Sequence, residues 1–369
     1  MELRDVAVRN FRNLASLDLE LPAAGVVILG DNGQGKTNLL EALYYLVLFR
    51  SLRGSQDREL VRFGEDGFFV AGTTVRRLDG QTVDSGIESR ITAGYETEGK
   101  RKKVTVGGAP VTRLADAVGQ VLAVALAPSD RVIVAGPASG RRRYLDVVLS
   151  LSNRGYLARL SEMRLALRQR NAALRRGRGD EAQAFDAAFA GAAGPVIAAR
   201  TEWVERWSGR LAELTVALGE RGAVNLKYRA HRPPTDDPAG QLRALLPTLL
   251  ARDLRRGATT AGPHRDDLDL SLEGKELRAY GSAGQQRTAA IALRLLEAET
   301  LQEATGVPPV GLYDDVFAEL DEDRQARLLR LIETSLPGQS VLTAPRESEI
   351  PRSLLDRPRW RMKGGRVDA

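Results

Sequence analysis

The chain has 369 residues, of which 43% are hydrophobic and 28% charged, a composition typical of a folded protein large enough for more than one compact unit. It has no cysteine and only two histidines, which excludes disulfides, thiolate nucleophiles and cysteine zinc sites. A metal would therefore need oxygen ligands. The longest apolar run, Leu39 to Phe49, contains Glu41 and is too short to cross a bilayer, so we expect a cytoplasmic protein without membrane contact.

Basic residues exceed acidic ones by 54 to 48, and the pI near 9.7 favours a polyanionic partner. A coding bias toward arginine would explain the total equally well. The distribution is more informative, because residues 141–178 contain eleven arginines and two acids, a net charge of +9. We interpret this cluster as part of a DNA-binding groove, since several phosphate contacts would release counterions. The alternative is a solvated helical face.

The first part of the chain has the pattern of strands followed by a helix. Polar and apolar residues alternate up to about residue 21, and Val26 to Leu29 is an apolar run suited to a buried strand. A helix is expected from Lys36. From Phe68 to Val111, short β-rich runs separated by glycine turns predict a meander.

The chain becomes helical after Pro128 and returns to alternating strands and helices near its end. Two helices are expected over Asn153 to Arg176 and Glu181 to Leu218, the second interrupted at Gly194-Pro195, and together they predict a short helical hairpin. The later elements expected are a strand-like segment at Leu268 to Leu277, a helix at Ala283 to Thr305, a strand ending at Tyr313, a helix at Glu322 to Ser335 and a strand at Ser340 to Thr343.

A phosphate-binding loop is predicted between the first buried strand and its helix. The segment matches the pattern of glycine, four residues, then Gly-Lys-Thr, and consists of Gly30, Asp31, Asn32, Gly33, Gln34, Gly35, Lys36 and Thr37. Glycines let backbone N–H groups surround phosphate oxygens, and the helix N-terminus adds positive potential. We expect Lys36 to reach the β- and γ-phosphates and Thr37 to bind Mg²⁺.

Two adjacent acids follow the later apolar strand. Asp314 would bind Mg²⁺, and Asp315 would orient or deprotonate the attacking water. Acids after a strand also occur in ordinary solvated loops, but the phosphate loop favours the catalytic interpretation.

Lys36 and Asp314 are 278 residues apart, so an insertion must separate two halves of one ATPase. We therefore expect ATPase segments at 1–120 and 261–369, and a mostly helical second lobe at 121–260.

The segment Gly281 to Gln286 resembles the signature motif of the ABC and SMC ATPase superfamily. In isolation, Ser282 would be an ordinary helix N-cap. The resemblance implies that Ser282 and Gly284 act on the γ-phosphate bound by a second subunit. It also implies a D-loop at Glu319-Leu320-Asp321, with Asp321 near the nucleotide. Where many ABC proteins have a switch histidine this chain has Thr343, and the Q-loop glutamine, Gln81 or Gln120, is not placed.

The whole chain resembles the RecF family. The motifs that carry the resemblance are Asn10-Phe11-Arg12-Asn13, the phosphate loop, Phe49-Arg50-Ser51, residues 141–146, Gly262 to Leu268, the signature with Gln285-Gln286-Arg287, and Asp314 to Phe317. The phosphate loop occurs in many families, whereas the motif at residues 262–268 and Gln285-Gln286-Arg287 are far more specific to this one. The family typically has aspartate at the position of Asp315, so this residue matches its pattern.

The resemblance implies an α/β fold, an ABC-type ATPase head with a helical second lobe and no long coiled coil. It further implies binding of ATP and Mg²⁺, an ATP-dependent homodimer, and engagement of duplex DNA near single-strand gaps. RecR and RecO would be partners in placing RecA on single strands, with slow DNA-stimulated hydrolysis. The alternatives are an ATPase that drives a membrane transporter and a chromosome tether of the SMC kind, which would need a long coiled coil.

Several further residues are candidates for the site. Arg12 could contact the nucleotide phosphates, although a surface arginine after a strand is nearly as plausible. His264 follows Gly262-Pro263 and is more plausible as part of a structural turn than as a catalytic group. The residues expected to contact DNA are Lys102, Lys103, Arg141, Arg142, Arg143, Arg168 and Arg175.

Overall fold

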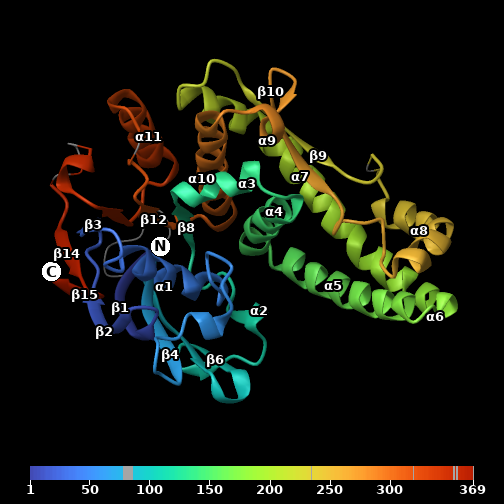
Figure 1. Cartoon of the computed structure of the whole chain (residues 1–369), viewed down its shortest axis with the longest axis horizontal. Helices are drawn as coiled ribbons and strands as arrows, with labels where there is room; N and C mark the ends of the chain where they lie inside the picture. The colour runs from blue at the N-terminus through green and yellow to red at the C-terminus, as the bar shows by residue number, and fades with distance from the viewer. Residues whose placement is uncertain (78–85, 234, 319, 352–353, 355, 369) are drawn as a thin grey trace. The chain divides into compact units, whose positions relative to one another are not determined.

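The computed structural model describes residues 1–77, 86–233, 235–318, 320–351, 354 and 356–368. It divides into two compact units (Figure 1). The first comprises Met1–Asp130, Ala217–Gly219 and Ile291–Ala369, and the second comprises Arg131–Val216 and Glu220–Ala290. These boundaries differ from the expected 121 and 261. The segment after residue 120 forms a strand of the first unit's sheet, and the segment after residue 261 pairs with a strand of the second unit.

The first unit contains a six-stranded antiparallel sheet in the order β2-β1-β4-β5-β6-β7. Its strands are β1 Glu2–Phe11, β2 Leu14–Glu20, β4 Gly67–Arg76, β5 Ile87–Glu96, β6 Arg101–Val106 and β7 Ala109–Pro110. The expected meander is confirmed by β4 to β7, which pair in chain order. Leu3, Val6 and Val8 of β1 are buried, and such alternation provides one apolar face.

A second six-stranded sheet in this unit has the order β15-β14-β3-β13-β12-β8. Its strands are β3 Gly25–Leu29, β8 Ala123–Leu126, β12 Val310–Asp314, β13 Ser340–Ala344, β14 Arg359–Lys363 and β15 Arg366–Asp368. All neighbours are parallel except β15 on β14. The carboxyl ends of β3, β13 and β12 therefore lie together, where open parallel sheets place their ligands.

Helix α1, Lys36–Leu48, contacts strands of both sheets and has eleven of its thirteen residues buried. Helix α11, Glu322–Ser335, connects β12 to β13. The remaining short helical segments of this unit are η1 Asp57–Glu59, η3 Glu98–Lys100, α2 Leu114–Ala117, η4 Pro128–Asp130 and η5 Glu347–Glu349.

The second unit is mostly helical. Its helices are α3 Arg131–Ala135, α4 Ala138–Ser152, α5 Arg154–Arg175, α6 Gly179–Ala184, α7 Asp186–Ala217, α8 Pro238–Arg256 and α9 Leu277–Tyr280. A three-stranded sheet in the order β11-β10-β9 completes it, with β9 Val224–Arg229, β10 Asp267–Leu272 and β11 Lys275–Glu276. Helix α10, Ala283–Thr305, begins in this unit and continues into the first.

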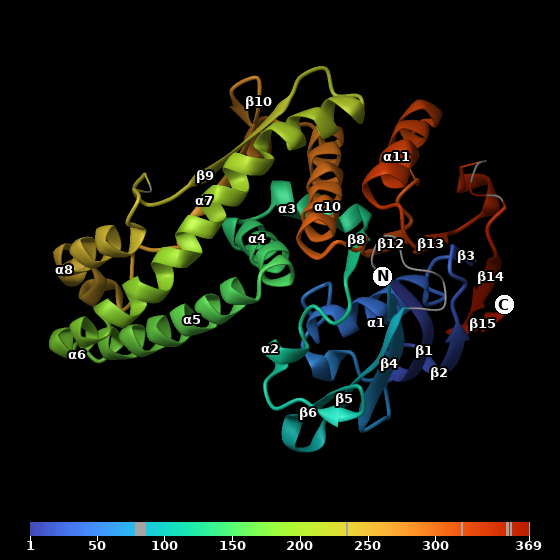
Figure 2. The same cartoon turned by 180° about the vertical axis from the view of Figure 1, so that it is seen from behind.

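The expected helical hairpin is confirmed by α5 and α7, which are connected through α6 (Figures 1 and 2) and joined by side-chain hydrogen bonds. Arg170 of α5 is completely buried and forms ion pairs with Asp186 and Asp253, each at 2.7 Å. The predicted interruption at Gly194-Pro195 is wrong, because α7 continues through Pro195. The residues on either side of Pro195 are buried, and Gly194 packs against Ala239. This packing outweighs the loss of the one backbone hydrogen bond that proline removes from a helix. Among the helices of the described residues, none is long and apolar enough to span a bilayer.

Candidate nucleotide-binding site

The phosphate loop runs from the end of β3 to the start of α1, as the sequence predicts. Gly33 and Gly35 have φ angles of +79° and +115°, which favour glycine. A Cβ atom on Gly35 would lie 2.8 Å from Nδ2 of Asn13, so this position has no room for a side chain. The Asn13 amide donates to the carbonyl of Gln34 at 3.1 Å and accepts from Asn38 at 2.8 Å. Asn13 thus fixes the loop to the first turn of α1.

A cavity of about 450 Å³ opens over this loop. It is lined by Asn32, Gly33, Gly35, Lys36, Thr37, Asn38, Arg53 and Asp315. The Lys36 ammonium donates to the carbonyl oxygens of Gly30 at 2.6 Å and Asp31 at 3.3 Å, so its charge lies at the loop. Exposed Asp31 and Asn32 form the outer part of the loop.

Hydroxyl groups connect the loop to the two acids after β12. The Thr37 hydroxyl donates to Oδ1 of Asp314 at 2.9 Å, and the Thr343 hydroxyl donates to the same oxygen at 2.9 Å. Two neighbouring ligands of an octahedral Mg²⁺ are about 3.0 Å apart when each lies about 2.1 Å from the ion. The separation of the Thr37 and Asp314 oxygens therefore fits a shared Mg²⁺.

Asp315 is held in a constrained position at the end of β12. Its φ is +47°, and its backbone N–H donates to Oγ1 of Thr343 at 3.1 Å. Burial and the neighbouring Asp314 raise the pKa of the Asp315 carboxyl, while the charge of Lys36 opposes this change. A carboxyl with a raised pKa is better suited to accept a proton from water. No role for Thr343 follows from the sequence, whereas in the structure its hydroxyl lies within 3.3 Å of carboxylate oxygens of both acids.

A buried carboxylate in α1 organises the arginines near the loop. Glu41 is fully buried and accepts from Arg12 at 3.1 Å, from Arg53 at 2.8 Å and from Ser51 at 2.5 Å. Burial favours the neutral acid, but the bonds from Ser51 and Arg12 and the charge of Arg53 keep the pKa of Glu41 below its usual value. Arg53, which sequence reasoning missed, lines the cavity. Arg12 is not among the lining residues, and its guanidinium donates to Glu41 and to Ser55.

The turn between β14 and β15 holds the loop from its other side. The backbone N–H of Gly364 donates to Oε1 of Gln34 at 2.7 Å, and that of Gly365 donates to the Gln34 carbonyl at 2.9 Å. Gln34 thus accepts bonds from Asn13 and from both glycines. A residue in the middle of the phosphate loop is fixed by a hairpin more than 300 positions later in the chain.

The signature segment forms the start of α10, and its Ser282 and Ala283 are exposed. The Ser282 hydroxyl accepts from the backbone of Gln285 at 3.2 Å, and the Gln285 side chain accepts from the backbone of Ser282 at 2.9 Å. This reciprocal arrangement is a capping box. Gly284 is half-buried in the first turn. Both residues belong to the second unit, whereas Asp321 belongs to the first and caps α11 by accepting from Arg324 at 2.8 Å. Glu319 and Gln81 lie outside the described residues.

The expected DNA contacts divide into buried and exposed groups. Arg141 is 2% exposed and forms a two-bond ion pair with Asp267, and Arg142 donates to the Asp266 carbonyl. A guanidinium held in this way is not available to a phosphate, so we exclude Arg141 from the DNA surface. The Lys102 side chain is largely buried, and its ammonium forms an ion pair with Asp57 at 2.7 Å. The exposed members are Lys103, Arg143, Arg168 and Arg175.

His264 has a structural environment. Its Nε2 lies 3.0 Å from the Thr259 carbonyl, and its ring packs edge to face on Phe189. Burial lowers its pKa to about 4, so the ring is neutral near pH 7. This setting is that of a structural turn, the interpretation that the sequence favours.

Comparison with known proteins identifies the family. A model described as the RecF/RecN/SMC N terminal domain matches residues 2–352. The DNA replication and repair protein RecF of Anaeromyxobacter sp. (strain K) is 38% identical over 351 residues, which cover 93% of this chain and 92% of that protein. A structure of the recombination mediator protein RecF with ATPrS, in the RecFOR pathway, is 30% identical, has a TM-score of 0.87 and covers 100% and 97% of the two chains.

An Smc head bound to the C-winged helix domain of ScpA is similar in fold alone. Its TM-score is 0.56 at 15% identity, and the match covers 100% of this chain and 96% of the other. The architecture is therefore that of an ABC and SMC-type head, with a short helical lobe in place of a long coiled coil. The chain belongs to the RecF family of DNA replication and repair proteins.

Proposed function

We propose that this chain is an ATP-dependent clamp for duplex DNA, acting in the cytoplasm. The observation that carries the proposal is the convergence of Lys36, Thr37 and Asp315 around one cavity, with Asp314 hydrogen-bonded to Thr37. A phosphate loop with this set of side chains is suited to a nucleoside triphosphate. The RecF relative solved with ATPrS supports ATP as the nucleotide.

Each residue has a distinct role in this proposal. The loop backbone from Gly30 to Thr37 binds the phosphates, and Lys36 neutralises charge on the β- and γ-phosphates. Thr37 and Asp314 would hold Mg²⁺, which supplies charge stabilisation when bound. Asp315 accepts a hydrogen bond from the attacking water, and Thr343 keeps both acids in position. Hydrolysis would be slow, as expected of a switch.

We propose that the nucleotide is shared between two copies of the chain. Ser282 is exposed at the N-terminal end of a 23-residue helix, with Gly284 in its first turn. A helix start of this kind can cap a γ-phosphate bound by a neighbour. Asp321, also exposed, would lie on the same dimer interface. ATP binding and dimer closure would then be one event, and hydrolysis would release it.

The exposed basic residues support binding to the DNA backbone without sequence preference. Arg168 and Arg175 project from α5, and among the described residues neither forms an ion pair. Lys103 is also exposed, with Glu96 at 3.6 Å as its neighbour. We propose duplex and gapped DNA as substrates, with hydrolysis stimulated by DNA. RecR and RecO are the proposed partners in loading RecA, in line with the pathway of the solved relative.

Mixing two inactive variants tests the shared site. Lys36→Ala and Ser282→Arg should each abolish ATP hydrolysis. In a mixed dimer, one composite site would keep both Lys36 and Ser282, so an equimolar mixture should recover about a quarter of the activity of the unaltered protein. Sedimentation with ATP would follow dimer formation in the same samples. Absence of recovery in a mixture that still forms dimers would refute sharing between copies.

Salt titration tests the DNA surface. Each lost phosphate contact should reduce the slope of log K against log salt by about 0.9. The double variant Arg168→Ala with Arg175→Ala should therefore lower the slope by up to about 1.8 and weaken binding in the presence of ATP. Arg330→Ala, which removes an exposed arginine of α11, serves as the matched control. An unchanged slope in the double variant would show that DNA binds elsewhere.

A further inference from the structure

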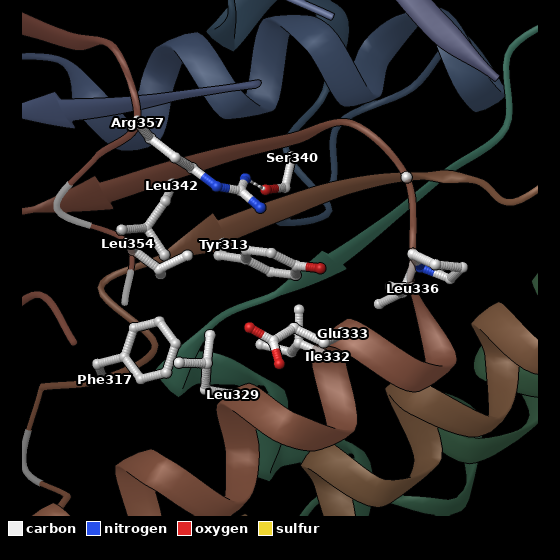
Figure 3. A pocket seen from close by; sticks show the side chains of 12 residues that line it. Tyr313, Phe317, Leu329, Ile332, Glu333, Leu336, Ser340, Leu342, Leu354 and Arg357 are labelled. Carbon is white, nitrogen blue, oxygen red and sulfur yellow. Dashed lines mark hydrogen bonds between the residues drawn. The ribbon is translucent and has the colours of Figure 1, made fainter. Parts of the chain in front are cut away.

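The first unit contains a second cavity, on the side of β12 opposite Asp314. It measures about 210 Å³ and lies between strands β12 and β13 and helix α11 (Figure 3). The residues that matter for its chemistry are Tyr313, Phe317, Leu329, Ile332, Glu333 and Arg357. An apolar cavity of about 150 Å³ is enough to bind benzene, so this one has room for an aromatic ring or a branched chain.

The Tyr313 hydroxyl is the unusual feature of the cavity. Tyr313 is 2% exposed, and among the described residues nothing hydrogen-bonds to its hydroxyl. Its ring lies back over Gly311, where an added Cβ would come within 2.3 Å of the hydroxyl oxygen. Gly311 thus permits this orientation of the phenol. Buried hydroxyl groups nearly always have a partner, so the position indicates a missing hydrogen-bond acceptor.

The cavity also offers a positive charge. Arg357 donates to the Ser340 hydroxyl, and among the described residues it forms no ion pair. Arg357 and Tyr313 both line the cavity, and Figure 3 shows the guanidinium on one side of the tyrosine ring. Glu333 lies on the other side of the tyrosine ring in Figure 3 and is exposed to solvent. An anionic group is therefore best accommodated beside Arg357.

We propose that this cavity binds an apolar group that carries a carboxylate. The apolar part would pack on Leu329 and Ile332, and the carboxylate would accept hydrogen bonds from Tyr313 and Arg357. A small free acid and the C-terminal residue of a partner protein share this chemistry. Tyr313 directly precedes Asp314, and Phe317 lies in the segment that leads to α11. An occupant would thus contact the back of the strand that carries the nucleotide-site acids.

An NMR titration of the full chain with phenylacetate tests the proposal. Phenylacetate should bind at least about tenfold more tightly than 2-phenylethanol, which has no charge. Tyr313→Phe retains the ring and should weaken phenylacetate about fivefold or more, and Arg357→Gln should weaken it about tenfold. Arg330→Gln, on the same helix as Leu329 but outside the cavity, should have no effect. Melting temperatures check that the variants are folded.

A short peptide ending in phenylalanine separates the two sources of the carboxylate. If the free-acid peptide binds more tightly than phenylacetate and its C-terminal amide does not, the occupant is a protein C-terminus. If phenylacetate binds more tightly than the peptide, the occupant is a small acid. Absence of saturable binding by both probes, or binding that Tyr313→Phe and Arg357→Gln leave unchanged, would overturn the proposal.

Discussion

The glycine turn between β14 and β15 gives a sharp test of how the phosphate loop is held. Gly364 and Gly365 both have positive φ angles, +56° and +77°. Their surroundings differ, because a Cβ on Gly365 would lie 2.4 Å from the Asn13 carbonyl oxygen, whereas a Cβ on Gly364 would meet nothing within 4 Å. Alanine at either position therefore introduces similar backbone strain, but only Gly365→Ala adds a steric overlap.

The magnitude follows from these two contributions. A left-handed alanine costs about 1 to 2 kcal/mol, and both variants share this cost. In Gly365→Ala the turn must also move away from residue 13, which removes the hydrogen bond to the Gln34 carbonyl, about 1 kcal/mol, and displaces Asn13. A loss of about 1.4 kcal/mol in the bound state is tenfold in affinity. We therefore expect Gly365→Ala to bind ATP about tenfold more weakly and Gly364→Ala to bind it within about threefold of the unaltered chain.

Fluorescence titration with a labelled ATP analogue would measure both affinities, and thermal unfolding would confirm that each variant is folded. Equal affinities for the two alanine variants would refute the reasoning. The hairpin would then contribute only to the stability of the sheet, and the loop would keep its shape without it.

Three other predictions concern single side chains. Thr343→Val should reduce ATP hydrolysis by about tenfold or more in single-turnover assays, with ATP affinity nearly unchanged, because it removes the hydroxyl that holds the two acids of β12. Arg141→Met should lower the free energy of unfolding by about 3 kcal/mol in denaturant titrations, since it removes the two-bond partner of buried Asp267 and leaves it with the more exposed Arg229 at 3.5 Å; a change below about 1 kcal/mol would contradict this. The pKa of His264 is lowered to about 4 from 6.5, so the folded state binds fewer protons than the unfolded state. Its contribution to stability is complete above pH 6.5 and should be lost as the pH falls toward 4, by up to about 3 kcal/mol, and His264→Gln should remove that part of the pH dependence.

The sequence predicted the parts of the site that depend on short-range spacing. The phosphate loop has a fixed pattern, and the apolar run before it places it after a strand, so Lys36 and Thr37 could be assigned directly. The start of α10 at Ala283 and of α11 at Glu322 also follows from capping residues next to helical patterns. These features are local, so neighbouring residues are sufficient to determine them.

Long-range pairing could not be predicted in the same way. Arg141 belongs to a basic cluster by sequence, but its partner Asp267 is 126 residues away, and a count of local charge does not include it. Neither Arg53 nor Thr343 stands in a motif that defines its role, and their roles depend on Glu41 and on the acids of β12. The burial of a charge depends on tertiary contacts, which composition does not record.

The strand order of the parallel sheet has a consequence for the synthesis of the chain. Strand β3 lies between β14 and β13, and β8 pairs only with β12 in the described sheet. All of these partners follow residue 309, so neither early strand can enter the sheet until residues after 309 have left the ribosome. The antiparallel sheet, by contrast, is made entirely of residues before 111 and can form early. A nascent chain therefore carries its phosphate loop long before the acids that complete it, and its nucleotide site is complete only after residues 310–344 have been made.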